Sequence, residues 1–575
     1  MTRAAATKSK LLKFLTGGVK DAKKRFDSRT GRFLAPNGGW TVTSQDIVWP
    51  LAVLYTAKAR GNPHCGRKSI LKLCARGGDA ICDWMNPDGT VVFIKVDGST
   101  WGDIYMCWTM YHWLEAYLLL RNDLDAPRLR RWEKHLRRTF GGVAERYRRS
   151  GFSVHNIPAW HAMGMILAAR AFDEPRWEEE GNRYLRQVAA SQHADGYWPE
   201  GGGPTASYNL VYVHAMGVWS RLSGEAVARR ALDRAVAFHR HFTYPDGSCV
   251  ETVDGRMKYN AGAWSMGLVG LSLDPEGRGL VELQLDNLLG GKRAGGLDPR
   301  LATLWKYLDD GPAVAPLQRQ AEAVSTHPAG RSARGLVRRK GPWFTCLSGY
   351  LTPRDARAGN AHNRWHMDRQ QHFSLWHDSL GLVVGGGNSK FQPDRSTFAV
   401  WSGGHCRHEA DSARLSKGAK SGDVITLKYG GQQCRLSVRV ASARKVELVF
   451  GAPRIGNREV VASFMLRLAP GERLRTSCDP QSARISPTEQ LLRSWPRNGG
   501  GGWLETDRLR VRVPAGTRFY YPQYPFNPYA IDGASPPEAA AAHICVSLSK
   551  GCIRAGFTVE VKPKQPRRKS GRGSG

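Results

Sequence analysis

The chain has 575 residues, of which 84 are lysine or arginine and 50 are aspartate or glutamate, so its formal net charge at pH 7 is +34. Hydrophobic residues make up 41% of the sequence, which is typical of a globular protein and excludes a largely disordered one. This length predicts two or three domains, and the excess of positive charge predicts a polyanionic partner.

Residues 1–43 are predicted to form a basic N-terminal segment without the apolar run of a secretory signal. No part of the sequence reaches the roughly 18 consecutive apolar residues of a membrane-spanning helix, so we expect no membrane span. The compartment stays open, because the sequence as it stands indicates a cytoplasmic protein, whereas a trimmed chain could be secreted or periplasmic. The sequence does not indicate an oligomeric state.

Residues 44–311 are predicted to form helices joined by short turns. Three of these turns share an Asp-Gly pair, namely Asp88-Gly89, Asp195-Gly196 and Asp246-Gly247. Asp195 and Asp246 are 51 residues apart, and Asp88 and Asp195 are 107 residues apart, which is about two such periods. Each period holds two helices, a pattern typical of repeated helical hairpins. Such hairpins stack as an open solenoid or close into an (α/α) toroid with a central groove, and we expect the toroid.

Several segments of this helical half are candidates to line the groove. Aromatic side chains beside amide and hydroxyl groups suit a sugar chain, because aromatic rings stack on the C–H faces of a pyranose. The positive charge favours carboxylated or sulfated sugars. Aromatic residues inside helices, such as Trp108 and Trp113, are more simply interpreted as core residues. The side chains that we expect to contact a substrate here are Trp101, Trp198, Glu200, His214 and Tyr259.

His155 and Asn156 stand just before Pro158, which predicts that they lie at a helix N-terminus, where backbone N–H groups favour an anion. Eliminative cleavage of a uronic-acid polymer needs a donor that neutralises the C5 carboxylate, a base that removes the C5 proton, and an acid that protonates the departing oxygen. Asn156, Tyr208 and a histidine from the C-terminal half would supply this minimum set.

The C-terminal half has a different pattern. Residues 312–340 are rich in Pro, Ala and Arg, and we interpret them as a linker. Residues 341–560 contain short alternating runs separated by Gly, Pro and Asp, which predicts an antiparallel β-sandwich. Residues 561–575 are predicted to be a disordered basic tail. The fold class is therefore α+β multidomain, with an N-terminal (α/α) toroid of helical hairpins followed by an antiparallel β-sandwich.

Histidines are concentrated between residues 362 and 377. The alternation over residues 372–376 predicts a strand, in which residues of one parity share a face. The even-numbered positions hold His362, His366 and Asp368 among others, so imidazole and carboxylate groups would share one face. This pattern indicates proton transfer or metal binding, and a polar sheet face with solvated histidines is the alternative.

The chain resembles the heparinase II/III-like polysaccharide lyases. The resemblance is carried by His155-Asn156, by residues 195–201 leading to Tyr208, and by His366-Met367-Asp368. It implies that Asn156 neutralises the carboxylate, that Tyr208 acts as acid and also as base, and that His366 completes the site, with His155 assisting. Asn156 and Tyr208 are 52 residues apart, about one period of the repeat, as the resemblance implies.

The sequence departs from that family at two places. The family strand usually has the pattern His-x-His-x-Asp, but Arg364 occupies its first position here, so either His366 or His362 takes the catalytic role. We place Arg364 and His362 among the substrate contacts. The family also tends to carry Asp-x-Gly after its apolar strand, where this chain has residues 385–388, Gly-Gly-Gly-Asn. A structural zinc or calcium site is therefore not supported, and we predict no metal and no other cofactor.

Three functions remain open. The first is a lyase that cleaves a uronic-acid-containing acidic polysaccharide by β-elimination. The second is a toroid glycoside hydrolase, which needs two carboxylates flanking the bond. The third is a non-catalytic protein that binds acidic glycans. No signature of specific nucleic-acid binding accompanies the charge. The carboxylates available to a hydrolase are Asp103, Asp195, Glu200 and Glu251.

Overall fold

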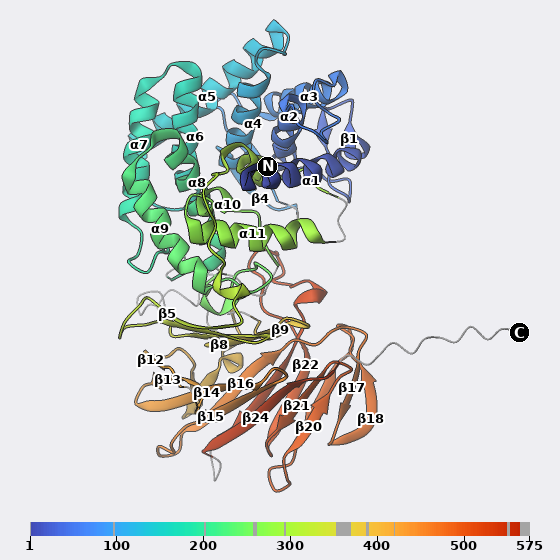
Figure 1. Cartoon of the computed structure of the whole chain (residues 1–575), viewed down its shortest axis with the longest axis vertical. Helices are drawn as coiled ribbons and strands as arrows, with labels where there is room; N and C mark the ends of the chain where they lie inside the picture. Colours follow the sequence, from blue (N-terminus) through green and yellow to red (C-terminus); the bar gives the residue numbers. More distant parts are fainter. Residues whose placement is uncertain are drawn as a thin grey trace, which may run out of the picture. The chain divides into compact units, whose positions relative to one another are not determined.

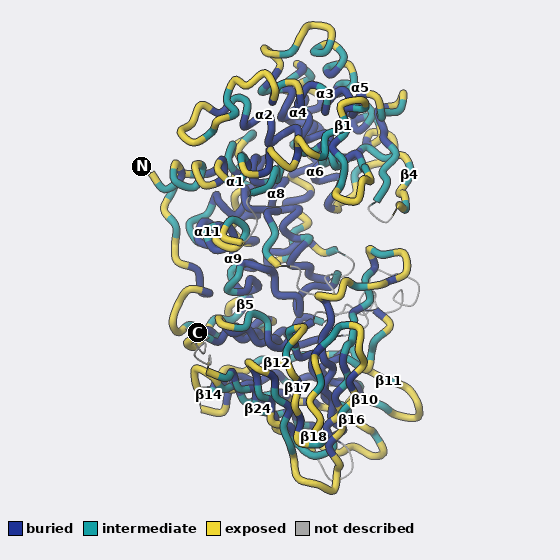
Figure 2. The backbone as a smooth tube through the Cα atoms, turned by 90° about the vertical axis from the view of Figure 1, so that its right-hand side faces the viewer, coloured by how far each residue is buried: buried dark blue, intermediate teal, exposed yellow. Residues whose placement is uncertain are grey.

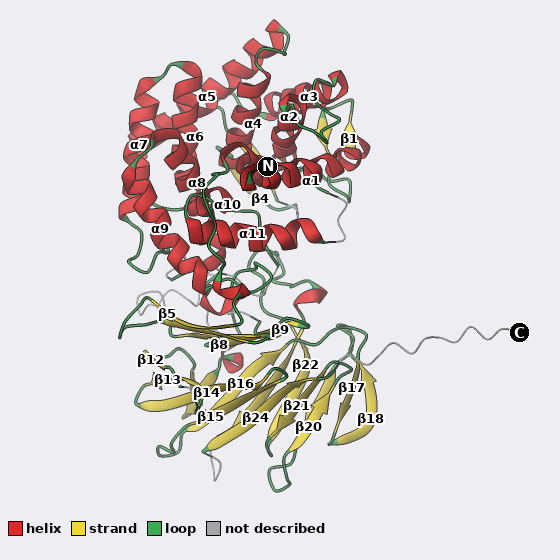
Figure 3. Cartoon of the chain, in the orientation of Figure 1, coloured by secondary structure: helices red, strands yellow, loops and turns green. Residues whose placement is uncertain are grey.

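A computed structural model describes most of the chain, and the described ranges are residues 2–95, 98–200, 203–256, 262–291, 295–351, 370–386, 390–418, 420–548 and 553–563. The chain divides into two compact units. The first unit holds Met1–Glu200, Pro204–Cys249 and Ala261–Pro316, and the second holds the remaining residues, including Val250–Asn260. The first is helical and the second is built from strands (Figures 1 and 3).

The described helices of the first unit are α1 (Arg3–Arg25), α2 (Val48–Thr56), α3 (Lys68–Trp84), α4 (Cys107–Leu120), α5 (Ala126–Ser150), α6 (Asn156–Phe172), α7 (Pro175–Ala190), α8 (Ala206–Ser223), α9 (Ala226–His241), α10 (Leu268–Leu271), α11 (Pro275–Gly290) and α12 (Pro299–Tyr307). Two short hairpins accompany them, β1 (Phe26–Asp27) with β2 (Arg32–Phe33) and β3 (Val91–Ile94) with β4 (Thr100–Ile104). No helix among the described residues is long and apolar enough to cross a membrane.

The even-numbered helices form a closed inner ring. Each of α2, α4, α6, α8, α10 and α12 contacts the next, and α12 contacts α2 again. The odd-numbered helices pack outside this ring. Helices α6 and α8 are buried over most of their circumference, whereas α5, α7 and α9 bury one face, as expected for inner and outer layers (Figure 2). The predicted (α/α) toroid is confirmed.

The inner helices α6 and α8 run parallel and in register. The indole N–H of Trp160 on α6 donates to the carbonyl of Val211 on α8 at 3.0 Å. Nearer the other end of the same helices, Arg170 donates to the carbonyl of Leu222 at 2.7 Å. The paired residues are 51 and 52 positions apart in the sequence, so the two helices run in the same direction. Their N-termini therefore lie at the same end of the ring.

A buried carboxylate joins the last inner helix to the rest of the ring. Glu115 of α4 has no exposed surface. It accepts hydrogen bonds from the Tyr111 hydroxyl at 2.9 Å and the Tyr307 hydroxyl at 2.8 Å, and it pairs with Lys306. Such a charge is tolerated inside a protein only when it is paired and hydrogen-bonded, so this cluster fixes α12 against α4.

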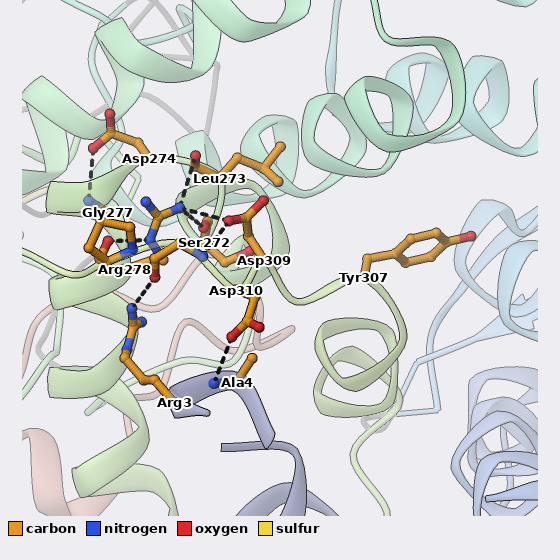
Figure 4. A network of polar contacts seen from close by, with 12 residues as sticks. Arg3, Ala4, Ser272, Leu273, Asp274, Gly277, Arg278, Tyr307, Asp309 and Asp310 are labelled. Atoms are coloured by element: carbon orange, nitrogen blue, oxygen red, sulfur yellow. Dashed lines mark hydrogen bonds and ion pairs between the residues drawn. The ribbon is translucent and has the colours of Figure 1, made fainter. Parts of the chain in front are cut away.

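The N-terminal helix and the segment after α12 share a second polar network (Figure 4). Arg278 of α11 donates to the carbonyl of Pro312 at 2.5 Å and pairs with Asp309 at 3.2 Å. Arg3 of α1 donates to the carbonyl of Gly311 at 2.9 Å. This network anchors α1 to the chain segment that follows the ring.

The basic segment predicted over residues 1–43 lies within the helical unit. Helix α1 buries one face against α2, α11 and α12. Its basic residues dominate the composition, but its apolar residues recur at helical spacing and face the unit. These buried apolar residues are Leu11, Leu12, Leu15 and Val19.

The second unit contains two sheets in which neighbouring strands are antiparallel. The strands of the first sheet are β19 (Leu491–Ser494), β22 (Thr517–Gln523), β23 (Ala541–Ser547), β16 (Glu459–Leu466), β9 (Gly381–Val384), β8 (Phe373–His377), β7 (Trp343–Ser348), β6 (Gly335–Lys340) and β5 (Glu322–His327) in spatial order, with β10 (Phe398–Ser402) beside β16 and β11 (His405–Arg407) beside β10. The strands of the second sheet are β12 (Ser412–Ser416), β13 (Asp423–Tyr429), β14 (Gln432–Ser442), β15 (Lys445–Gly451), β24 (Arg554–Val561), β21 (Leu509–Val513), β20 (Gly502–Glu505), β17 (Arg473–Thr476) and β18 (Asp479–Arg484).

One apolar core contains residues of both sheets, including Phe373 and Phe464 of the first and Phe450 and Phe557 of the second. The predicted antiparallel β-sandwich is thus confirmed. Within residues 312–340, predicted as a linker, β5 and β6 form a hairpin over 322–340, and the first unit ends at Pro316. Of the predicted tail, Val561 closes β24, and residues 564–575 lie outside the described ranges.

Replacing Lys306 with methionine should lower the free energy of unfolding of the helical unit by about 3 kcal/mol, because the buried Glu115 carboxylate would lose its cation. Urea denaturation followed by circular dichroism measures this change. The matched control is Arg229→Met, which breaks an exposed pair with Asp233 and should cost less than about 1 kcal/mol. Equal losses in the two variants would contradict this role of the Glu115 cluster.

Candidate functional site

The N-terminus of α6 carries two of the predicted site residues. His155 precedes the helix in extended conformation (φ −152°, ψ 177°) and is exposed, and Asn156 is the first helical residue. No side chain caps this terminus. The side chain of Asn156 is 8% exposed and has no hydrogen-bond partner within the described ranges. Free backbone N–H groups and the helix dipole favour an anion at this position.

Tyr208 lies at the corresponding level of the neighbouring inner helix. It is the third residue of α8 and is half-buried. Trp160 and Val211 are level, as their hydrogen bond shows. Asn156 precedes Trp160 by four residues and Tyr208 precedes Val211 by three, so Asn156 and Tyr208 lie at nearly the same height on adjacent parallel helices. The structure thus brings His155, Asn156 and Tyr208 to one end of the inner ring.

Glu200 connects these two helix ends electrostatically. Its carboxylate accepts a hydrogen bond from the Tyr212 hydroxyl at 3.1 Å, one helical turn after Tyr208. Partial desolvation lowers the pKa of His155, the carboxylate of Glu200 opposes this shift, and the positive charge of Arg146 adds to it. The net effect is a pKa below the ordinary value, so the imidazole of His155 is neutral at pH 7.

A cavity of about 330 Å³ adjoins the N-terminus of α6. Its walls come from β4, from the end of α5 and from the start of α6. Trp101 on β4 is 46% exposed, and its ring contacts Phe93 of β3 edge-on at 5.1 Å. The polar and aromatic residues of the walls include Trp101, Tyr105, Arg146, Tyr147, His155 and His161.

A short chain of hydrogen bonds forms one wall of this cavity. The imidazole of His161 lies 2.8 Å from the carbonyl oxygen of Tyr105 through Nε2, and 2.6 Å from the Tyr147 hydroxyl through Nδ1. A carbonyl only accepts, so Nε2 carries the proton, and Nδ1 accepts from Tyr147. Burial lowers the pKa of His161 to about 4 and raises the pKa of Tyr147, so both side chains are neutral at pH 7.

Sequence reasoning did not single out Arg146 or Tyr147 as site residues. Arg146 and Tyr147 belong to the last turns of α5, directly before the turn at Gly151 that leads into α6. The predicted site began only after this turn. Residues on both sides of a turn at the rim contribute to the same surface. The basic and aromatic residues before Gly151 could therefore have been predicted to line the site together with those after it.

Two predicted substrate contacts lie in the helical core instead. Trp198 has no exposed surface, donates its indole N–H to the carbonyl of Val188 at 2.6 Å, and stacks on Tyr212. His214 is also fully buried and stacks on Trp160 with ring centres 4.6 Å apart. Burial holds the pKa of His214 well below its usual value. A polymer cannot reach either ring in this structure, so we assign both to helix packing.

The remaining predicted residues lie outside the described ranges. They are Tyr259, His362, Arg364 and His366. Two later histidines of the same stretch are described. His372, beside β8, is buried and donates from Nδ1 to the carbonyl of Ser348 at 2.8 Å, and His377 donates from Nε2 to the carbonyl of Ala443 at 3.2 Å. The described part of the predicted strand is therefore packed and hydrogen-bonded rather than solvated.

The carboxylates considered for hydrolysis differ in their surroundings. Asp195 is buried, and Glu251 is buried within the second unit. Asp103 is exposed and accepts a hydrogen bond from Asn86 at 2.7 Å. Glu200 alone is coupled to His155. Within the described ranges, no group of three or more His, Cys, Asp or Glu side chains is arranged to hold a metal ion.

Comparison with known proteins identifies the fold. No family model and no curated protein sequence matches the chain. A crystal structure of heparinase III matches 98% of this chain and 85% of its own, with 13% identity and a TM-score of 0.54. The chondroitin AC lyase of Streptomyces coelicolor A3, solved with chondroitin sulphate, matches 98% and 79% with 13% identity and a TM-score of 0.52. The chain therefore has the fold of the heparinase II/III-like polysaccharide lyases, as the resemblance implied.

The buried imidazole of His161 should make the protein less stable in mild acid. An unfolded histidine binds its proton near pH 6.5, whereas folded His161 binds it only near pH 4, so stability is complete above pH 6.5 and falls as the pH decreases towards 4. When the pH is lowered from 7 to 5, this group alone should reduce the free energy of unfolding by about 2 kcal/mol. Urea denaturation of the wild type and of His161→Gln at both pH values measures it, because the variant should lose that share of the pH dependence.

Tyr147→Phe is the matched control for this experiment. It removes the hydroxyl that donates to His161 but leaves the imidazole buried, and burial is the main cause of the low pKa. This variant should be less stable at both pH values while keeping the wild-type pH dependence. If His161→Gln kept the wild-type pH dependence of stability, the buried imidazole of His161 would not be the cause of the acid sensitivity.

Proposed function

We propose that the chain is a polysaccharide lyase that cleaves a uronic-acid-containing acidic polysaccharide by β-elimination. The observation that carries this proposal is the placement of Asn156 and Tyr208 at the same height on adjacent inner helices. The fold, shared with a heparinase and a chondroitin lyase, supports it. The net charge of +34 supports an anionic substrate.

Asn156 would stabilise the uronate before and during proton removal. Its amide N–H and the free N–H groups at the start of α6 donate to the C5 carboxylate, which acidifies the adjacent C–H and stabilises the enolate-like charge. His155, neutral at pH 7, adds a donor without introducing a charge of its own. The uncapped terminus leaves these donors available to the substrate.

Tyr208 would transfer the proton. As base it takes the proton from C5, the C4–O bond then breaks while the C4–C5 double bond forms, and the proton passes to the departing glycosidic oxygen. No water is consumed, and the products are an unsaturated uronate and a new hydroxyl end. His366, which lies outside the described ranges, is proposed as the second base or neutralising group.

Tyr208→Phe should lower kcat by about 10²–10⁴-fold, because the variant cannot transfer the proton. The ultraviolet absorbance of the unsaturated uronate, measured on a panel of glycosaminoglycans, alginate, glucuronan, ulvan and pectate, monitors the reaction. Tyr55→Phe, which removes a surface hydroxyl bonded to Asp123, is the control and should keep wild-type kcat. Full turnover by Tyr208→Phe would remove Tyr208 from the mechanism.

Measurements of reducing ends and of binding on the same panel of polysaccharides separate the other two functions. New reducing ends without ultraviolet absorbance would identify a hydrolase. Salt-sensitive binding without either product would identify a glycan-binding protein.

Asn156→Asp should reduce kcat/KM more than Asn156→Ala does. Loss of one donor to a developing oxyanion typically costs about 10²–10³-fold, and a carboxylate placed beside the substrate carboxylate adds repulsion. Steady-state kinetics on the identified polymer measures both variants, and thermal unfolding establishes that each is folded. If the aspartate variant were as active as the alanine variant, Asn156 would not face the substrate carboxylate.

A further inference from the structure

The cavity beside α6 has one formal charge on its walls. Among the described lining residues there is no aspartate or glutamate, and Arg146 is the sole arginine or lysine. Its volume of about 330 Å³ is at the lower end of the roughly 300–1,000 Å³ of ligand pockets. The space therefore suits a short part of a polymer that carries a negative group.

Arg146 differs from the other arginines at the end of α5. Arg148 pairs with Glu145 and Glu180, and Arg149 pairs with Glu145. Arg146 has no ion pair within the described ranges, although its side chain is exposed at the cavity. Since Arg148 and Arg149 are paired with glutamates, Arg146 is the guanidinium that remains available to an external anion.

The charge of Arg146 acts on the whole cavity. Desolvation is the main cause of the shifted pKa values of Tyr105, His155 and His161, and the positive charge of Arg146 lowers all three. These groups come from three parts of the wall, the end of β4 and two turns of α6. An anion bound beside these groups would therefore be attracted by the charge of Arg146.

The rest of the cavity supplies a platform and a fixed wall. The exposed ring of Trp101 offers an aromatic face of the kind on which a pyranose stacks. The hydrogen bonds of His161 to Tyr105 and Tyr147 fix another part of the wall. Phe152 stacks on Tyr184 with ring centres 4.5 Å apart, which holds the turn between α5 and α6. Such preorganisation reduces the entropy lost on binding.

We propose that this cavity is a subsite for a sugar unit next to the cleaved bond, and that Arg146 determines specificity by binding the carboxylate or sulfate group of that unit. Trp101 stacks on its ring. The inference rests on the proposed function, because His155 belongs both to the cavity wall and to the proposed catalytic end of α6.

Binding and kinetics of Arg146→Gln test the subsite. Isothermal titration with tetrasaccharides from heparan sulfate and from chondroitin sulfate should show a Kd raised by about 10- to 100-fold, the effect of one lost charge-assisted hydrogen bond. In turnover assays KM should rise by a similar factor while kcat changes little. Arg146→Lys should recover part of the affinity, because it keeps the charge but not the planar fork.

Arg149→Gln is the matched control, since it removes the same charge from the same helix but lies outside the cavity. It should change Kd by less than about 2-fold, a typical effect of an exposed charge. Equal effects of Arg146→Gln and Arg149→Gln, or no binding of either tetrasaccharide by the wild type, would overturn the proposal. Thermal unfolding of each variant establishes that it is folded.

Chemically modified tetrasaccharides identify the anion. If desulfation removes the difference between wild type and Arg146→Gln, Arg146 binds sulfate. If the difference survives desulfation and disappears after reduction of the carboxyl groups, it binds carboxylate. Arg146-dependent binding without an unsaturated product would leave the subsite in place and refute the lyase proposal, whereas product formation without any effect of Arg146 would refute the subsite alone.

Discussion

The buried carboxylate of Glu115 holds the helical unit closed, and the arrangement of the candidate site depends on that closure. Glu115 binds two tyrosine hydroxyls and Lys306, so α12 is fixed against α4 and the ring returns to α2. In a closed ring each inner helix packs between two neighbours. This packing fixes the position of the helix along the axis of the ring. The heights of α6 and α8 in turn determine that Asn156 and Tyr208 share one rim.

The period of the helical hairpins could be predicted from the sequence, and with it the part of the site that depends on the period. The turns at Asp195 and Asp246 are 51 residues apart. The hydrogen bond between Trp160 and Val211 joins residues with the same separation. Residues one period apart therefore meet on adjacent helices. The alternating apolar residues of the C-terminal half likewise predicted its sheets.

Other features depend on information that one sequence does not contain. Trp198 and Trp101 have the same side chain and both stand close to a carboxylate in the sequence, yet one is fully buried and the other is exposed. Arg146 and Arg149 look equivalent in a basic run, and only the position of Glu145 distinguishes the paired guanidinium from the available one. The packing of helix α1 was not predicted, because its charge is more conspicuous in the sequence than its buried stripe of leucines.

The order of the helices along the chain has a consequence for biosynthesis. The ring is sealed by α12, the last inner helix to leave the ribosome, and it is sealed against α2, the first. Until α12 is made, the largely buried helices α2 and α10 each lack one of their two neighbours in the ring. The nascent unit must therefore protect a large hydrophobic surface over the synthesis of some 250 residues, a situation in which chaperones shield exposed apolar segments from aggregation.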